Sequence, residues 1–425
     1  MDKILAPFVK GRIEAVVRVP GSKSITQRAL ICASLATGDS KLIGALKSED
    51  IELSSNALRE LGVNILEQGD SNLDIQGVGC KVRQGPKEIF LGNNGTGMRF
   101  ITAVCGLGEG EYILDGTKRM QERPIEPLLE ALRGWGVKAE SLKATGCPPV
   151  KIETSGISGG KTYIDASKSS QFLSALMLIA PCAQRPCEIE ILKGLVSRPY
   201  IEITKKVMAA FFVDVTEDKN IFFIPNQGYK GTDYEIEGDA SSASYFWAAA
   251  AITGGSIEVE NVPTSSMQGD AKFVEILKEM GCRVEKGHKG VRVNGPLDGE
   301  LKSIDIDMSK WPDMVPTLAA VAVFADGVTR IKNVHHLRIK ETDRLSAVAN
   351  ELKKLGVNVK EFEDGLEIEG KRDLTPELID TYDDHRIAMS FAVIGLRCKG
   401  LYIKDPACVR KSFPNFWQKW QEMLS

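Results

Sequence analysis

The amino-acid sequence repeats one pattern of segments six times. In each copy a polar turn leads into a helix rich in small and apolar residues, and a strand, a second helix and a further strand follow. The first helices are predicted to begin near Thr26, Met98, Gln171, Ala243, Val315 and Ile387, so the period is about 72 residues. Solenoid repeats are shorter, at roughly 20 to 50 residues. Each copy is therefore predicted to be a folding module of its own.

Strands are predicted after the first helix of each copy, where β-branched residues stand at alternating positions. They cover residues 40–46, 111–115, 188–192, 256–261, 328–333 and 401–404. The second helix of most copies ends at a glycine that suits a C-terminal cap: Gly62, Gly136, Gly281 and Gly356. The third copy lacks this glycine, and the sixth ends in an aromatic-rich helix over residues 416–424 with no strand after it.

The six copies are expected to form two domains, because 425 residues exceed what one hydrophobic core usually serves. Residues 12–19 precede the first copy and have the pattern of a strand, and the simplest closure has this strand complete the sheet of the last copy. The domains are then residues 21–238 and residues 239–425 with 1–20, three copies each, joined by a two-strand hinge near residues 20 and 239.

The first helices carry Ala, Leu, Ile and Met on nearly all sides, as in residues 246–252 and 317–324. Helices that are apolar all round are typically buried. The sequence therefore predicts an α/β (α+β) fold of two similar domains, each made of three βαβαββ-type repeats with buried helices and outer sheets.

The charge balance argues against a nucleic-acid partner, since 57 acidic residues face 54 basic ones and the net charge is -3. No apolar run approaches the ~18 residues of a membrane span, and residues 1–10 do not resemble a signal peptide. Nine cysteines without a Cys-x-x-Cys pair, and only four histidines, fit reduced thiols better than a disulfide framework or a metal site. We expect a cytoplasmic monomer with no membrane contact, no metal and no cofactor.

The stretch Pro20-Gly-Ser-Lys-Ser-Ile-Thr-Gln-Arg28 joins a strand to the first buried helix. Its cations Lys23 and Arg28 stand at a helix N-terminus, where unpaired N–H groups and the helix dipole favour an anion. A solvated cap would give the same pattern, but other copies repeat it. If the buried helices run side by side, their N-termini share one face of each domain, and two such faces opposed suit a small polyanion.

Similar turns recur along the chain. They are the glycine-rich residues 91–99, the cations of 118–124, the hydroxyls of 167–171 and 197–200, and the charged residues of 310–313, 338–344, 383–386 and 410–411. Each stretch, taken alone, also fits a solvated loop or an ordinary helix cap. Lys340 and Arg344 are four apart and are predicted to share a helix face with Glu341 beside them. The turn at residues 239–242 has no cation and is predicted to be structural.

Collected from these turns, seven cations surround two carboxylates: Lys23, Arg28, Arg123, Lys340, Arg344, Arg386 and Lys411, with Asp313 and Glu341. Such a set would bind substrates that carry several phosphate and carboxylate charges. The two carboxylates would then serve as general base and general acid, with cations keeping one ionised and burial raising the pKa of the other.

Motifs spread in order over the whole chain resemble those of the 5-enolpyruvylshikimate-3-phosphate synthase family. They are Pro20-Gly-Ser-Lys-Ser24, Leu91-Gly-Asn-Asn-Gly-Thr-Gly-Met-Arg99, Glu122-Arg-Pro-Ile125, Ser169-Ser-Gln171, Ser197-Arg-Pro-Tyr200, Lys340-Glu-Thr-Asp-Arg344 and Asp384-His-Arg386. The resemblance implies the enolpyruvyl transferase fold. It also implies transfer of the enolpyruvyl group of phosphoenolpyruvate to the 5-hydroxyl of shikimate 3-phosphate, with release of phosphate, in the pathway to chorismate and aromatic amino acids.

By the same resemblance, two overlapping sets of residues would hold the substrates. Shikimate 3-phosphate would contact Lys23, Ser24, Arg28, Ser169, Ser170, Gln171, Ser197, Tyr200, Asp313, His336 and Lys340. Phosphoenolpyruvate would contact Lys23, Gly95, Arg123, Gln171, Arg344, Arg386 and Lys411. Asp313 would take the proton of the 5-hydroxyl, Glu341 would protonate the methylene carbon, and Lys23 would complete the catalytic set; a tetrahedral ketal phosphate then collapses. His336 departs from the family, many members of which have asparagine there.

Three other functions remain open on the residues. An enolpyruvyl transferase that acts on a UDP-sugar is similar in fold but uses a loop cysteine where this chain has Lys118. RNA 3′-phosphate cyclase shares a similar repeated unit and needs a histidine nucleophile, for which His385 is the candidate. A regulatory anion-binding protein on the same scaffold should have lost Asp313 or Glu341, and both remain.

Overall fold

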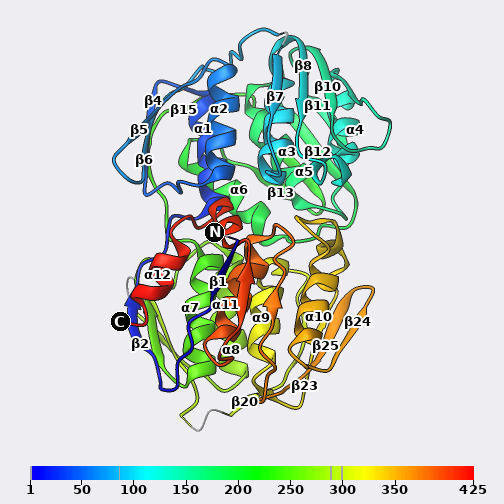
Figure 1. Cartoon of the computed structure of the whole chain (residues 1–425). Helices are drawn as coiled ribbons and strands as arrows, with labels where there is room; N and C mark the ends of the chain where they lie inside the picture. Colours follow the sequence, from blue (N-terminus) through cyan, green and yellow to red (C-terminus); the bar gives the residue numbers. More distant parts are fainter. Residues whose placement is uncertain (1, 86, 288–289, 298–299) are drawn as a thin grey trace. The chain divides into compact units, whose positions relative to one another are not determined.

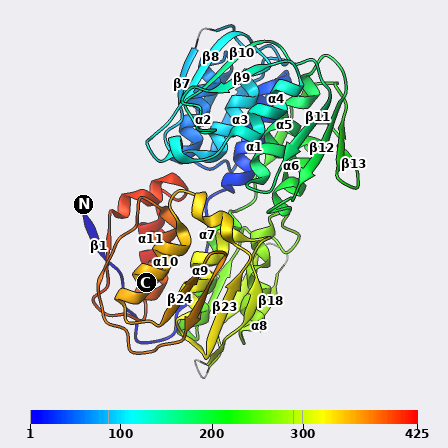
Figure 2. The same ribbon diagram turned by 90° about the vertical axis from the view of Figure 1, so that its right-hand side faces the viewer.

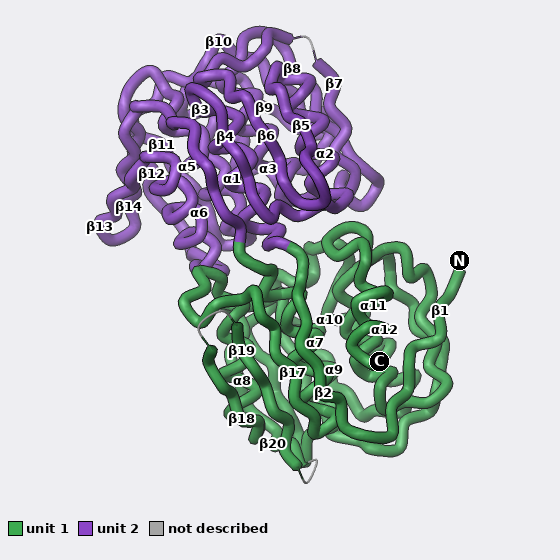
Figure 3. The backbone as a smooth tube through the Cα atoms, turned by 90° about the vertical axis from the view of Figure 1, so that its left-hand side faces the viewer, with its two compact units in different colours: residues 1–20, 237–425 green, residues 21–236 purple. Residues whose placement is uncertain are grey.

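The structure is a computed structural model that describes residues 2–85, 87–287, 290–297 and 300–425 (Figure 1). The chain divides into two compact units, coloured separately in Figure 3. Unit 2 is Gly21–Ile236, and unit 1 combines Met1–Pro20 with Glu237–Ser425. The chain therefore passes from one unit to the other twice. Among the described residues, no helix combines the length and the apolar character that crossing a membrane requires.

Unit 2 contains three four-stranded sheets in its described residues. The first sheet has the strand order β16 (Asp233–Glu235), β4 (Asp39–Ile43), β6 (Asn72–Gln76) and β5 (Asn64–Gln68). The second sheet has the strand order β7 (Lys87–Phe90), β8 (Glu109–Asp115), β10 (Val150–Ser155) and β9 (Lys138–Ser141). The third sheet has the strand order β11 (Gly160–Asp165), β12 (Cys187–Lys193), β14 (Ile221–Ile224) and β13 (Thr216–Asp218). A separate two-stranded sheet pairs β15 (Tyr229–Lys230) with β3 (Ala36–Thr37).

The helices of unit 2 alternate with these strands. The first helices of its three copies are α1 (Lys23–Leu35), α3 (Gly95–Cys105) and α5 (Ser170–Ile179). The second helices are α2 (Glu49–Glu60), α4 (Glu126–Gly134) and α6 (Pro199–Ala210), and two short 3-10 helices are η1 (Met120–Glu122) and η2 (Ala180–Cys182).

Unit 1 repeats the plan. One four-stranded sheet has the strand order β18 (Arg283–Lys286), β19 (Val291–Asn294), β17 (Ser256–Val259) and β2 (Glu14–Val17), and another has the order β21 (Asp305–Asp307), β23 (Val328–Lys332), β25 (Gly365–Glu369) and β24 (Val359–Phe362). A three-stranded sheet has the order β1 (Lys3–Leu5), β27 (Tyr402–Lys404) and β26 (Leu378–Ile379), and β20 (Leu301–Lys302) pairs with β22 (Ala325–Asp326). Its helices are α7 (Ala240–Thr253), α8 (Phe273–Glu279), α9 (Val315–Ala322), α10 (Arg344–Lys354), α11 (His385–Gly395), α12 (Phe416–Glu422), η3 (Gly269–Lys272), η4 (Pro312–Met314), η5 (His335–Ile339) and η6 (Pro406–Lys411).

The first helix of each copy forms the core of its unit. Every residue of α7 is buried, and so is every residue of α9 and α11. These three helices pack on one another, as α1, α3 and α5 do in unit 2. Strands such as β4 and β23 alternate exposed and buried residues, as strands do when one face of the sheet meets water. Figures 1 and 2 show α7, α9 and α11 together within unit 1, and α1, α3 and α5 together within unit 2. The predicted α/β class with buried helices and outer sheets is confirmed.

Most first helices begin up to three residues earlier than predicted. α1 begins at Lys23, α3 at Gly95 and α7 at Ala240. The reason is local capping: the side chains of Ser22, Asn94 and Asp239 each accept a backbone N–H of the first turn. Residues predicted to lie in the turn, Lys23 among them, therefore belong to the helix itself.

The second helices of four copies end as predicted. Gly62, Gly136, Gly281 and Gly356 follow them with φ of 103°, 89°, 109° and 80°, in the left-handed region that favours glycine. In the third copy Phe212 takes this place with φ of 67°. A residue with a side chain adopts this left-handed conformation at a cost in free energy, yet the turn after the second helix is the same as in the other copies. The copies therefore share backbone geometry even where the sequence signal is lost.

The prediction for the N-terminal strand is wrong in its partner. β2 pairs in parallel with β17, so residues 12–19 supply an edge strand to the fourth copy instead of the sixth. The sixth copy is closed by β1, which pairs with β27. Correspondingly, β16 leads to α7 of unit 1 but pairs with β4 of unit 2. The chain leaves each unit between a strand and the helix that follows it, so each crossing exchanges one strand.

The prediction that all thiols are reduced is also wrong. Cys80 and Cys182 form a disulfide within unit 2, with Cα atoms 5.4 Å apart across 102 residues of sequence. The segment after β6 returns along the end of α1, where the N–H of Cys80 donates to the carbonyl of Leu35 at 3.0 Å. Cys182 ends η2, directly after α5. Because the pairing depends on how two copies pack, spacing along the sequence could not reveal it.

Candidate active site

The first helices of unit 2 begin without an acidic side chain of their own. α1, α3 and α5 have no acidic side chain in the first turn, whereas the second helices α2, α4 and α6 each have at least one. Acidic residues at a helix N-terminus normally offset the helix dipole. Their absence from the helices that begin at Lys23, Gly95 and Ser170 leaves these ends suited to an anion that comes from outside the chain.

Lys23 is held at the start of α1 by a carboxylate that sequence reasoning missed. Its Nζ lies 3.2 Å from Oδ2 of Asp50, whose side chain is 3% exposed. The carbonyl of Asp50 also accepts an N–H from the side chain of Asn94 at 2.7 Å. Asp50 therefore ties α2 to the N-terminal ends of α1 and α3. In the sequence, it is indistinguishable from the ordinary acidic residue of a helix first turn.

Arg28 is buried among helices. Its Nε donates to Oγ1 of Thr204 at 2.7 Å and its Nη2 to Oγ of Ser174 at 3.2 Å, while its Nη1 binds the carbonyl of Ser24 at 2.9 Å. The guanidinium lies 5.9 Å from the ring centroid of Tyr200. Burial lowers the pKa of Arg28 to about 10, so the side chain keeps its charge near neutral pH. Arg28 thus links α1 to α5 and α6.

The glycine-rich turn allows an arginine to lie against the start of α3. A Cβ on Gly95 would meet Nη2 of Arg123 at 2.3 Å and Nη1 of Arg99 at 2.8 Å. Nη1 of Arg123 donates to the carbonyl of Asn93 at 3.1 Å, and Nη2 of Arg99 donates to the carbonyl of Pro124 at 2.6 Å. The candidate Gly95 and the candidate Arg123 are therefore in direct contact, and a larger residue at position 95 would displace the guanidinium of Arg123.

The serine candidates lie at the starts of α5 and α6. Ser169 caps α5 by accepting the N–H of Gln171 at 3.2 Å, and Ser170 is buried beside it. The Gln171 side chain donates to Oγ1 of Thr96 at 3.1 Å, which joins α5 to α3. Ser197 is buried with φ of 54° just before α6, which carries Tyr200. Apart from Arg123, which follows η1, the candidates of unit 2 therefore lie at or near the beginnings of four helices, which hydrogen bonds link.

In unit 1, Arg344 lies at the centre of three carboxylates. It begins α10, and its side chain is 2% exposed. Its Nε is 2.7 Å from Asp384, its Nη1 is 2.9 Å from Asp313 and its Nη2 is 2.8 Å from Glu341. Although burial opposes its charge, Asp384, Glu341 and Asp313 raise the pKa of Arg344 above its ordinary value. Asp384 is fully buried and also caps α11. Sequence reasoning quoted Asp384 in a motif but gave it no role.

Asp313 is shared by two arginines. Its second oxygen lies 2.8 Å from Nη2 of Arg386, in the first turn of α11. Burial alone would raise the pKa of Asp313, but Arg386, Arg344 and Lys340 together hold it well below its usual range. Asp313, Glu341, Arg344 and Arg386 thus form one connected cluster.

A further buried carboxyl group adjoins this cluster. Ser241 donates to Oδ2 of Asp270 at 2.5 Å, and its Oγ lies 3.5 Å from Nη2 of Arg386. Burial and the nearby Asp313 raise the pKa of Asp270 to about 7. Ser241 belongs to the cation-free turn that was predicted to be structural, and the charges around it come from distant segments. Nothing near Asp270 in the sequence signals this position.

The remaining candidates of unit 1 lie on neighbouring segments. His336 is 1% exposed, and burial, Lys340 and His335 lower its pKa to about 3, so its imidazole is neutral. Lys340 follows η5 with an extended backbone, and α10 begins only at Arg344, so the prediction that the two share a helix face is wrong. The peptide segment between them is not helical. Lys411 is buried at the end of η6, which packs on α11.

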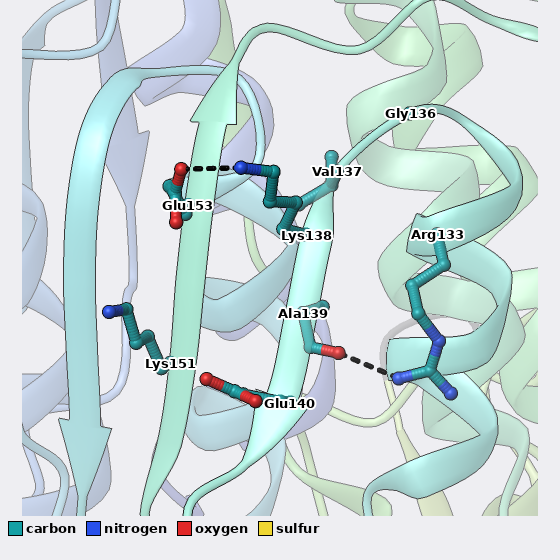
Figure 4. Close-up of a pocket in the computed structure, with 8 residues that line it drawn as sticks. All are labelled: Arg133, Gly136, Val137, Lys138, Ala139, Glu140, Lys151 and Glu153. Atoms are coloured by element: carbon teal, nitrogen blue, oxygen red, sulfur yellow. Dashed lines mark hydrogen bonds and ion pairs between the residues drawn. The ribbon is translucent and has the colours of Figure 1, made fainter.

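The candidate residues do not line a pocket that the surface of unit 2 presents. This pocket, of about 450 Å³, is lined by Arg133, Gly136, Val137, Lys138, Ala139, Glu140, Lys151 and Glu153 (Figure 4). Its cations are paired with carboxylates, as Lys138 is with Glu153 at 2.8 Å, Lys151 with Glu111 at 2.7 Å and Arg133 with Glu126 at 2.6 Å. Within the described part of the chain, no group of three or more His, Cys, Asp or Glu side chains is placed to hold a metal ion.

Comparison with known proteins finds the same relatives by sequence and by structure. The sequence model of the family described as EPSP synthase (3-phosphoshikimate 1-carboxyvinyltransferase) matches residues 9–420. The 3-phosphoshikimate 1-carboxyvinyltransferases of Syntrophobacter fumaroxidans and Trichormus variabilis are each 44% identical, over 428 and 427 residues, and the alignments cover 100% of both chains. A solved structure of EPSP synthase from Acinetobacter baumannii has a TM-score of 0.82 at 27% identity, covering 100% of this chain and 98% of that one.

Proposed function

The chain belongs to the EPSP synthase (3-phosphoshikimate 1-carboxyvinyltransferase) family, and on that premise we propose that its buried clusters of cations and carboxylates bind and activate the two substrates of this reaction. The enzyme transfers the enolpyruvyl group of phosphoenolpyruvate to shikimate 3-phosphate in the shikimate pathway. The observation that carries the proposal for the site is the contact of Arg344 and Arg386 with Asp313 and of Arg344 with Glu341. Cations for a polyanionic substrate are thereby combined with two carboxyl groups that can move protons.

The two substrates are assigned to overlapping sets of residues. Shikimate 3-phosphate is bound by Lys23, Ser24, Arg28, Ser169, Ser170, Gln171, Ser197, Tyr200, Asp313, His336 and Lys340. Phosphoenolpyruvate is bound by Lys23, Gly95, Arg123, Gln171, Arg344, Arg386 and Lys411. The starts of α1, α3 and α5, whose first turns hold no acidic side chain, support this assignment, because helix N-termini favour phosphate and carboxylate groups. The neutral imidazole of His336 can donate one hydrogen bond to an anion.

The proton transfers are assigned to Asp313 and Glu341. Asp313 takes the proton of the 5-hydroxyl while the hydroxyl oxygen forms a bond to C2 of phosphoenolpyruvate. Glu341 gives a proton to the methylene carbon. The product of this addition is a tetrahedral ketal phosphate. Glu341, left ionised by the addition, takes back a proton from the new methyl group as the bond to phosphate breaks, which restores the double bond. The phosphate leaves with the proton that Asp313 had taken from the hydroxyl. Lys23 and the arginines stabilise the charge that develops on the phosphate.

Binding of phosphoenolpyruvate would itself prepare these carboxyl groups. Arg344 and Arg386 hold Asp313 ionised, and a base with so low a pKa accepts protons poorly. When the anionic groups of phosphoenolpyruvate share these arginines, their hold on Asp313 and Glu341 weakens. The pKa of Asp313 then rises toward the range in which it can exchange protons. The contact of Nε of Arg344 with Asp384 would keep the guanidinium in place meanwhile.

The reaction is tested by phosphate release. We expect phosphate to appear when the protein meets both phosphoenolpyruvate and shikimate 3-phosphate, and not with either substrate alone. A UDP-sugar in place of shikimate 3-phosphate should give no release, since the loop position of the related enzyme's cysteine holds Lys118. Release with the UDP-sugar, or none with the proposed pair, would contradict the proposal. We also propose that the protein is a cytoplasmic monomer, and sedimentation tests the oligomeric state. The hinge near residues 20 and 239 stays a prediction.

Gly95→Ala is expected to raise KM for phosphoenolpyruvate about tenfold or more, because a displaced binding group can cost up to about a hundredfold. The added Cβ would lie 2.3 Å from Nη2 of Arg123, which therefore has to move. Gly11→Ala is a matched control, since nothing lies within 4 Å of a Cβ at Gly11. Steady-state kinetics of both variants measure the effect. A KM for phosphoenolpyruvate in Gly95→Ala equal to that of Gly11→Ala would remove Arg123 from this subsite.

A further inference from the structure

Glu351 is a buried carboxylate of unit 1 for which the proposed mechanism has no use. It lies in α10, and its side chain has no exposed surface. It follows Arg344 by seven residues, which is two helical turns, so the two side chains project from the same face of α10. Charged groups are rarely buried unless other groups bind them. The partners of Glu351 therefore indicate why the carboxylate is there.

These partners belong mainly to the segment between β26 and α11. The hydroxyl of Tyr382 donates to Oε1 of Glu351 at 2.7 Å, and the backbone N–H of Asp380 donates to Oε2 at 3.0 Å. Lys354, on the same helix, lies 2.7 Å from Oε2. Burial and Glu351 raise the pKa of Tyr382 above its ordinary value, so the phenol keeps the proton that it donates. Glu351 thus binds the segment at two points.

The segment from Asp380 to Asp384 has a backbone that needs such support. Tyr382 and Asp383 both have left-handed φ, at 53° and 56°. Side chains with a Cβ adopt this conformation at a cost in free energy, and it persists only where the surroundings impose it. The segment ends at Asp384, whose N–H donates to the carbonyl of Thr381 at 2.8 Å.

Asp384 in turn connects this segment to the arginines. It accepts Nε of Arg344 at 2.7 Å and the backbone N–H of Arg386 at 2.9 Å. Two bridges therefore join α10 to the same segment, Arg344 to Asp384 and Glu351 to Tyr382. With Nε held by Asp384, Nη1 and Nη2 of Arg344 point to Asp313 and Glu341. The planar guanidinium binds anions through fixed directions, so a small rotation would misdirect it.

We propose that Glu351 and Tyr382 are positioning residues that fix Asp384, and through it the orientation in which Arg344 binds phosphoenolpyruvate. The inference rests on the proposed function, because it assigns a consequence for one of the two substrates. Neither residue touches the reacting groups in this account. Their contribution is to hold a conformationally costly segment at the position where its last carboxylate meets the guanidinium.

Tyr382→Phe tests the proposal. The variant keeps the ring, which packs on the core of unit 1, and removes the hydroxyl that donates to Glu351. We expect KM for phosphoenolpyruvate to rise about tenfold, the factor that corresponds to 1.4 kcal/mol of binding free energy. KM for shikimate 3-phosphate should stay within about twofold, because eight of its eleven assigned residues belong to unit 2, whereas Tyr382 belongs to unit 1. A loss of stability alone would not separate the two substrates in this way.

Tyr112→Phe is the matched control. The hydroxyl of this buried tyrosine also donates at 2.7 Å, to the carbonyl of Arg83, but it lies in unit 2 outside the candidate residues. Both KM values of the control should equal those of the unaltered chain. Glu351→Gln provides an independent arm, and should also raise KM for phosphoenolpyruvate selectively.

Equal KM values in Tyr382→Phe and Tyr112→Phe, or equal rises for both substrates, would overturn the proposal. If Tyr382→Phe does not fold, the same criteria apply to Glu351→Gln. Failure of the proposed function is a different result: the unaltered chain would then release no phosphate from the substrate pair. The two outcomes are distinguished by including the unaltered chain in every assay.

Discussion

Asp313→Asn is expected to lower kcat at least about a hundredfold, the lower end of what a positioned acid or base contributes. The carboxylate lies 2.9 Å from Nη1 of Arg344 and 2.8 Å from Nη2 of Arg386, so its position is fixed by two guanidinium groups. An amide of the same shape cannot accept the proton of the 5-hydroxyl. It also leaves the arginines with a weaker partner, which favours anion binding. The loss should therefore appear in kcat, with KM for phosphoenolpyruvate unchanged or lower.

The comparison requires a control aspartate outside the cluster. Asp326 is exposed on unit 1 and pairs with Arg372 at 3.4 Å, and Asp326→Asn should leave kcat unchanged. Rapid-quench measurement of a single turnover separates the chemical step from product release. A single-turnover rate for Asp313→Asn within tenfold of the Asp326→Asn rate would mean that another group accepts the proton.

Arg344→Met is expected to lower the free energy of unfolding of unit 1 by about 3–5 kcal/mol, the range measured when one partner of a buried ion pair is removed. The side chain is 2% exposed and neutralises Asp384, Asp313 and Glu341 together. Without it, a fully buried Asp384 loses its charge partner. Methionine retains much of the volume of the arginine stem, so the loss reports charge more than packing.

Urea unfolding followed by signals from each unit measures this loss, since a chain of two units need not unfold in one step. Arg330→Met is the matched control: Arg330 lies 2.7 Å from Glu367 but is 49% exposed. A pair so exposed contributes at most about 1 kcal/mol. The difference between the variants should shrink as the pH falls, because the pKa of Asp313 is lowered by its arginines and the stability that this shift contributes is lost as Asp313 takes up a proton. Equal losses in the two variants at neutral pH would show that the carboxylates are stabilised by other groups.

The disulfide and the exchanged strands show where sequence reasoning reached its limit. Cys80 and Cys182 belong to different copies of the repeat and meet only because α1 and α5 pack together. Likewise, the alternation in residues 12–19 identifies a strand without identifying its partner, and β2 joins β17. Strand patterns describe which face is buried, and any sheet with a free edge of the right length satisfies them.

In the candidate site, too, some residues could be located from the sequence and others could not. The cations Lys23, Arg344 and Arg386 could be located from the sequence because each stands in the first turn of a helix, and helix starts have local signals. The groups that hold these cations could not. Asp50 lies 27 residues from Lys23, and Asp384 lies 40 residues from Arg344. An acidic residue at such a distance has no pattern that separates it from a solvated one.

By itself, the sequence determined the repeated module, the burial of its first helices and the candidate residues at their N-terminal ends. These depend on periodicity and capping, which are set by neighbours within about four residues along the chain. Only the tertiary structure decided which carboxylate meets which cation, which strand closes which sheet and which cysteines bond. Those outcomes depend on side chains far apart in the chain, whose distances are set by the packing of whole helices.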